Sequence, residues 1–263
     1  MSERRDKRLS VASGSGVFAD DDRGVSNVVG YVLVFSLVTV TIGVVFAVGI
    51  TGVEDRQNAE RVANVERAFD VFDDNLRDVQ LYNDPSRSTE MRLSGGTLSL
   101  SETTRVELQN GSNGTVLERE FRSLTYTSGE TTIAYETGAW FRSDGGATIM
   151  RSEPRFVADA GRTTLPLVLL YPDGNPTVAG EGTVQVGAGG LRSTTGSDYA
   201  ADDGPFHLRI ESAYADAWQR YFERTDGFDV DETETTADTV VVTLEEDDVV
   251  YVPRIALDVG LRR

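Results

Sequence analysis

The chain offers few side chains that could carry out acid–base chemistry. Its only histidine, His207, lies in the strand-like stretch Phe206–Ile210. General-base catalysis needs a second group within hydrogen-bond reach, and no motif such as Gly-x-Ser-x-Gly supplies one. We therefore expect His207 to be a solvent-facing or hydrogen-bonded strand residue. We predict no catalytic residues and no enzyme activity.

Five acidic residues near the C-terminus are spaced closely enough to suggest a cation: Asp226, Asp229, Asp231, Glu232 and Glu234. An EF-hand loop also needs a turn glycine and a terminal glutamate at fixed spacing, which this segment lacks. Ten acids and no base lie between Thr225 and Pro253, which favours a solvated acidic face over a metal site. Gly187-Ala188-Gly189-Gly190 lacks the spacing of a dinucleotide-binding loop, so no cofactor is expected.

Two consecutive sequons predict N-glycosylation sites, at Asn110 (Asn110-Gly111-Ser112) and at Asn113 (Asn113-Gly114-Thr115). Asn-Gly is also the favoured dipeptide of tight β-hairpin turns. The sequence alone leaves both explanations open.

The charge balance is strongly acidic, with 43 Asp and Glu against 25 Lys and Arg, a net charge of −18 and a single lysine, Lys7. An acidic, lysine-poor surface suits very high salt, where charge repulsion is screened within about 3 Å at molar ionic strength. The composition resembles that of haloarchaeal proteins. No basic stripe lies outside the first 24 residues, so we expect no nucleic-acid partner. Cysteine is absent, which excludes disulfides and thiolate chemistry.

Residues 25–53 form a run of 29 residues without a charge. About 20 helical residues cross the roughly 30 Å hydrocarbon core of a bilayer, so this run predicts a transmembrane helix. A buried core helix is the alternative, but such helices rarely extend this far without a charge. A cleaved secretory signal would have a shorter apolar segment and a small-residue exit site. We therefore expect the helix to be retained.

Residues 54–82 continue the helix as an amphipathic stem. Its apolar residues are spaced alternately three and four apart, which is a heptad seam, and they are Val62, Val65, Phe69, Phe72, Leu76 and Val79. The seam fits either packing on the chain's own β domain or pairing with neighbouring subunits. Residues 83–90, which include Pro85, are expected to break the helix and act as a linker.

Residues 91–263 predict a β-rich, sandwich-like domain of many short strands with glycine-rich turns. Gly95-Gly96 and the segment 110–114 each suggest a hairpin. Val249–Val252 and Ile255–Val259 are expected as separate strands. One helix, Ser212–Arg224, is expected with Ser212 as its N-cap. The fold class is therefore α+β, with a long N-terminal helix and a β domain that contains one short helix.

The junction Arg23-Gly24-Val25-Ser26, directly before the apolar run, resembles the processing site of archaeal type IV pilins and archaellins, above all the haloarchaeal pilin-like proteins. The resemblance implies that residues 1–24 are a polar leader, removed by a prepilin peptidase between Gly24 and Val25 on the cytoplasmic side. The chain departs from bacterial-type pilins at Val29, where those proteins carry an acid, and its leader is long and acidic.

These features together predict a pilin-like, single-pass membrane protein with an extracellular β domain and no enzymatic activity. The expected partners are the lipid membrane, prepilin peptidase and other pilin subunits. A minor type IV pilus subunit or an adhesion component fits this description. The alternative is an anchored ectodomain that binds a ligand or partner without polymerising. Arginines follow the span as well as precede it, so the positive-inside rule does not set the orientation.

Overall fold

The computed structural model describes residues 22–82, 86–111, 114–159, 161–201, 204–244 and 249–263. The chain divides into two compact units, Met1–Gln57 and Asn58–Arg263. The helices and strands are α1 (Asp22–Tyr82), β1 (Arg87–Ser99), β2 (Thr103–Asn110), β3 (Thr115–Arg122), β4 (Leu124–Ser128), β5 (Thr131–Glu136), β6 (Ala139–Asp144), β7 (Ala147–Ser152), β8 (Val157–Asp159), β9 (Arg162–Thr164), β10 (Leu167–Pro172), β11 (Thr177–Ala200), β12 (Phe206–Glu211), α2 (Ala215–Phe222), β13 (Phe228–Val230), β14 (Thr239–Leu244) and β15 (Val249–Arg262).

The predicted α+β fold is confirmed. The apolar run and the amphipathic segment form one helix, α1, of 61 residues. No Gly or Pro lies between Glu54 and Tyr82, so nothing in this part of the sequence interrupts the helix. The second helix, α2, has only 8 residues.

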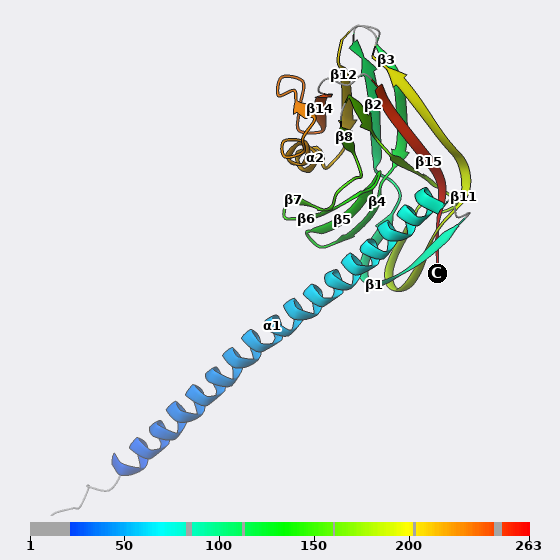
Figure 1. The fold of residues 1–263 in the computed structure, drawn as a ribbon. Coiled ribbons are helices and arrows are strands. Elements are labelled where there is room, and N and C mark those ends of the chain that lie inside the picture. The colour runs from blue at the N-terminus through cyan, green and yellow to red at the C-terminus, as the bar shows by residue number, and fades with distance from the viewer. Residues whose placement is uncertain (1–21, 83–85, 112–113, 160, 202–203, 245–248) are drawn as a thin grey trace, which may run out of the picture. The chain divides into compact units, whose positions relative to one another are not determined.

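The strands form two sheets (Figure 1). The large sheet has ten strands in the order β7-β6-β5-β4-β1-β11-β15-β9-β8, and β10 also pairs with β15. The small sheet has five strands in the order β13-β14-β12-β2-β3. Most pairs are antiparallel, but β15 runs parallel to β9 and β10.

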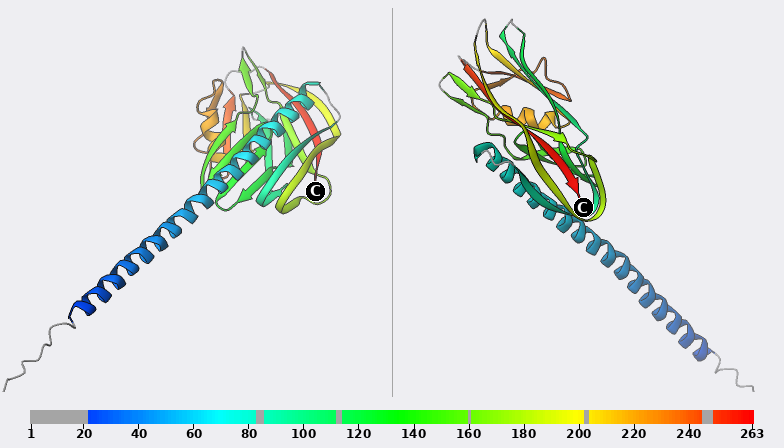
Figure 2. Two further views of the ribbon diagram at one scale, coloured as in Figure 1. Left: turned by 90° about the horizontal axis from the view of Figure 1, so that it is seen from below. Right: turned by 90° about the vertical axis from the view of Figure 1, so that its right-hand side faces the viewer.

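The unit Asn58–Arg263 contains two hydrophobic clusters, one on each face of the large sheet. In β15, Leu257 belongs to the cluster that includes the stem of α1, and its neighbour Ala256 belongs to the cluster shared with the small sheet and α2. This alternation follows from the two-residue period of side chains along a strand. The stem, the large sheet and the small sheet therefore form three layers, and Figure 2 shows the stem along the large sheet.

The predicted hairpin at Gly95-Gly96 is wrong, because β1 runs through both glycines as one strand. Its register with β11 shifts between Ser94 and Thr97, which marks a bulge, and Gly95 and Gly96 have φ values of 98° and 81°. A Cβ on Gly96 would lie 2.6 Å from the carbonyl oxygen of Thr127, so only glycine fits there. β1 already begins at Arg87, inside the segment 83–90 expected to be a linker.

Two further predictions fail in detail. Val249–Val252 and Ile255–Val259 are not separate strands but parts of β15, which continues through Pro253. α2 begins at Ala215 with Tyr214 as its N-cap, and no side chain caps it. Ser212 instead accepts a hydrogen bond from the backbone N–H of Tyr214 at 2.9 Å and donates one to Glu136 at 2.7 Å. The hydroxyl that the sequence predicted as the helix N-cap therefore binds Glu136 instead.

Candidate functional site

The apolar part of α1 meets the length and composition of a membrane span. Its most apolar stretch, Asn27–Ala47, has 21 residues and a mean hydropathy of 2.5. At about 1.5 Å per residue this stretch is as long as the hydrocarbon core of a bilayer is thick. Its large apolar side chains are all exposed, between 50% at Val38 and 72% at Tyr31. The helix is therefore consistent with a single-pass anchor or a signal sequence.

Two of the polar side chains inside this stretch are compatible with lipid. The Thr39 hydroxyl donates to the carbonyl oxygen of Phe35 at 2.8 Å, and the Thr41 hydroxyl donates to that of Leu37 at 2.7 Å. Both hydroxyls are thus satisfied within the helix, which removes the cost of exposing them to hydrocarbon. The predicted processing residues, Gly24 and Val25, lie in the first turns of α1, and their side chains are outside the described part of the structure.

The heptad seam of the stem packs on the chain's own β domain. Val65, Phe69, Phe72, Leu76 and Val79 are each at most 1% exposed. Of the two alternatives that the sequence left open, the structure supports the intramolecular one.

Polar contacts join the stem to the hairpin of β6 and β7. Arg142 forms a salt bridge of 2.6 Å with Glu66 of the stem. The indole N–H of Trp140 donates to Asp70 at 3.1 Å, and the hydroxyl of Ser152 donates to Asp73 at 2.8 Å. Asp73 is 3% exposed, and burial raises the pKa of its carboxyl although Ser152 and Arg77 oppose that shift.

His207 lies on β12 as predicted, half-buried, with its Nδ1 3.1 Å from the Thr243 hydroxyl.

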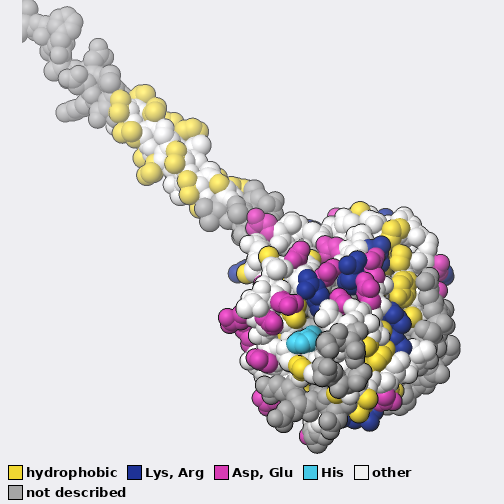
Figure 3. Space-filling model, turned by 90° about the horizontal axis from the view of Figure 1, so that it is seen from above, with side chains coloured by type: hydrophobic (Ala, Val, Ile, Leu, Met, Phe, Trp, Pro, Cys, Tyr) yellow, Lys and Arg dark blue, Asp and Glu magenta, His cyan; other side chains and the backbone are white. Residues whose placement is uncertain are grey.

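In the acidic segment, Asp231 accepts hydrogen bonds from the backbone N–H groups of Thr233 and Glu234, which fixes a turn. The described residues contain no group of three or more His, Asp or Glu side chains placed to hold a metal ion. Arginine and acidic side chains are interspersed on the face that carries the histidine (Figure 3).

The two sequons differ in what the structure shows of them. Asn110 ends β2, is 7% exposed and donates through Nδ2 to the carbonyl oxygen of Ala200 at 2.9 Å. Asn113 lies outside the described residues. β2 and β3 do pair as a hairpin around this segment, as the sequence predicted.

One carboxylate that the sequence gave no reason to single out lies at the centre of the β domain. Glu136, at the end of β5, is 1% exposed and contacts four polar groups. Its Oε1 lies 2.8 Å from the hydroxyls of both Thr104 and Ser123. Its Oε2 accepts from the Ser212 hydroxyl at 2.7 Å and from the Trp218 indole at 3.2 Å. Burial raises the pKa of Glu136, although the four hydrogen bonds act against that shift.

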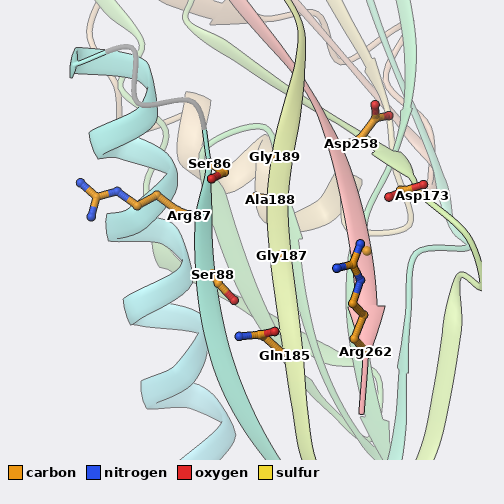
Figure 4. Close-up of a pocket in the computed structure, with 11 residues that line it drawn as sticks. Ser86, Arg87, Ser88, Asp173, Gln185, Gly187, Ala188, Gly189, Asp258 and Arg262 are labelled. Carbon is orange, nitrogen blue, oxygen red and sulfur yellow. The ribbon is translucent and has the colours of Figure 1, made fainter.

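A polar groove of about 520 Å³ lies where β1, β11 and β15 run side by side (Figure 4). Its floor contains Gly187, which pairs with Ser88 on one side and with Gly260 on the other. Asp173, Gln185, Asp258 and Arg262 add donors and acceptors around this floor. A groove with this lining can bind a small polar molecule that both donates and accepts hydrogen bonds.

Packing does not explain the glycine at the centre of the floor. A Cβ on Gly187 would meet no heavy atom within 4 Å. Gly187 is also not among the residues with positive φ. A strand-interior glycine often marks a place where a ligand or another backbone approaches closely. The sequence did single out this glycine-rich segment, but only as a failed dinucleotide motif.

Comparison with known proteins adds one relationship. No curated protein and no solved structure matched the chain. A family model described as "Family of unknown function (DUF7289)" matches residues 23–260, which include the apolar helix, the stem and nearly all of the β domain. Since the match covers most of the sequence, the chain belongs to this family of unknown function.

Proposed function

We propose that the chain is a pilin-like, membrane-anchored cell-surface protein of a halophilic archaeon, with its β domain outside the cell. The observation that carries the proposal is the exposed apolar surface of Asn27–Ala47. Each large apolar side chain gains roughly 1.5–3 kcal/mol when it leaves water. A helix with such residues on every side has its lowest free energy in lipid or among other apolar helices.

The resemblance at Arg23-Gly24-Val25 extends the proposal to processing. Prepilin peptidase cuts on the cytoplasmic side, so cleavage between Gly24 and Val25 places the residues after the span outside. The membrane and the peptidase are then the first two partners. No catalytic step belongs to the proposal, because the sequence carries no catalytic motif.

The proposal is tested by fractionation and by protease treatment of intact cells. The chain is expected in the membrane fraction, and external protease is expected to digest residues 91–263. A matched sample of lysed cells shows whether the domain can be cleaved at all. If the domain is digested only after lysis, the proposed orientation is wrong.

Two observations favour an anchored ectodomain that does not polymerise over a filament subunit. Five of the six residues of the stem's apolar seam are already buried against the chain's own β domain, so they are not available to neighbouring subunits. The polar groove gives the domain a place for a small ligand. Cross-linking on intact cells separates the two candidates: a pilus or adhesion subunit gives ladders of linked chains, and an anchored monomer does not.

A further inference from the structure

The hydrogen bonds around Glu136 need one more hydrogen than the neighbouring hydroxyl groups supply. Glu136 Oε1, Thr104 Oγ1 and Ser123 Oγ form a triangle in which each pair of atoms lies 2.8 Å apart. Every side of the triangle has the length of a good O–H···O hydrogen bond and therefore needs one hydrogen. The two hydroxyls supply one hydrogen each, and an ionised carboxylate supplies none. One side of the triangle would then set two lone pairs against each other.

We propose that Glu136 is a neutral carboxylic acid in the folded protein, and that its proton on Oε1 closes a ring of three hydrogen bonds with Thr104 and Ser123. With that proton, each oxygen of the triangle donates once and accepts once. The proton is taken from solvent as the chain folds. The buried acid thus makes the stability of the β domain depend on pH.

The other carboxyl oxygen fits the same assignment. Oε2 receives the Ser212 hydroxyl and the Trp218 indole N–H, and the indole nitrogen can only donate. The Ser212 hydroxyl accepts from the backbone N–H of Tyr214, and that contact leaves its own hydrogen available for Oε2. Oε2 therefore acts as the carbonyl oxygen of the acid, with both of its lone pairs used.

Charged groups on the neighbouring elements are engaged elsewhere. On β2, Arg105 lies within 3.6 Å of each of three surface glutamates. On α2, Arg220 pairs with Asp216 at 3.2 Å. The other neighbouring acid, Glu102, accepts from the Tyr214 hydroxyl at 3.2 Å. On β3, Arg122 pairs with Glu120, and on β12, Arg209 pairs with Glu211. These contacts direct the nearby cations to other carboxylates, and burial favours the neutral form of Glu136.

The direction of the pH effect follows from proton uptake on folding. Burial raises the pKa of Glu136 in the folded state above its value in the unfolded chain. The stabilisation from this group is complete below the unfolded pKa of about 4.3 and is lost as pH rises through the folded pKa. The domain should therefore lose stability as the pH rises. Exposed carboxylates do not produce this loss, because burial does not raise their pKa.

The test uses the full-length protein in an ester-free detergent and compares wild type with Glu136→Gln. A carboxamide keeps the shape of the neutral acid and places N–H donors toward Thr104 and Ser123. At pH 7, the infrared spectrum of wild type minus that of Glu136→Gln should show a positive carbonyl band of a protonated carboxylic acid. Between pH 5 and pH 9, the Tm of Glu136→Gln should rise relative to wild type by several degrees. Glu130→Gln, a substitution at an exposed turn of the same sheet, should retain the band and follow the wild-type pH profile.

Two results would overturn the proposal: a wild-type spectrum without the band, or a Tm difference that does not change with pH. If Glu136→Gln does not fold, Thr104→Val supplies a second reading. It removes one partner of the acid while preserving side-chain volume, so the band should shift in frequency. An unshifted band would show that the protonated group lies elsewhere and would equally reject the assignment.

Discussion

Phe72 of α1 and Tyr135 of β5 meet edge to face, with ring centroids 5.3 Å apart and an interplanar angle of 82°. Both side chains are 1% exposed. This contact joins the stem to the large sheet, and Phe69 extends it with a ring contact of 6.4 Å to Trp140. The stem is therefore one layer of the β domain's core rather than a separate helix.

Truncating the seam should destabilise the domain. Removing a buried phenylalanine costs about 3–5 kcal/mol, so Phe72→Ala in the full-length protein should lower Tm by several degrees. The neighbouring Val71 is 51% exposed, and Val71→Ala is the matched control with little expected effect. An unchanged Tm for Phe72→Ala together with loss of an oligomer would instead show that the seam joins subunits.

Asn110 should be unmodified in the folded protein. A sugar on Nδ2 needs space beyond that atom, which a side chain only 7% exposed does not offer. Glycopeptide mapping should therefore find residue 110 bare, whatever the state of Asn113. Asn110→Ala should cost about 1–3 kcal/mol, because the carbonyl of Ala200 loses its donor. A glycan found on Asn110 would contradict this account.

Filling the groove should change ligand binding without harming the fold. Gly187→Val adds a β-branched side chain to a strand where a Cβ meets nothing within 4 Å, so Tm should stay the same or rise. A small polar ligand of the ectodomain, found by screening neutral sugars and amino acids against the full-length protein, should lose affinity. Asp229→Asn, on the small sheet, is the control that should retain it. A ligand bound equally well by Gly187→Val would show that the groove is not its site.

The features that the sequence predicted are those with a strong local pattern. The charge-free run and the heptad seam fix the extent of α1, because hydrophobic periodicity over many residues is the clearest signal of a helix. The bulge at Gly95-Gly96 was mistaken for a hairpin because both structures use glycines with positive φ. The partner of β1 on both sides of the bulge is β11, which lies far away in the sequence.

The buried acid and the groove had no comparable signal. Glu136 precedes a turn, where a glutamate is ordinarily exposed, and its four partners come from three separate parts of the chain. Those groups come together only because the large sheet, which contains β5, packs on the small sheet, which contains β2 and β12. Ser212 was assigned to a helix cap for the same reason, since the local pattern carried no information about the distant carboxyl group.

The most direct test of the central claim, a retained and processed membrane protein, is the mass of the mature N-terminus. The protein would be purified from membranes of a halophilic archaeal host with and without its prepilin peptidase. We predict a chain that begins at Val25 when the peptidase is present and an uncut chain when it is absent. A membrane-bound chain that begins at or near Met1 in both hosts would contradict the pilin-like account. A chain that is missing from the membranes and is found in the medium without Asn27–Ala47 would show that the helix is a signal sequence.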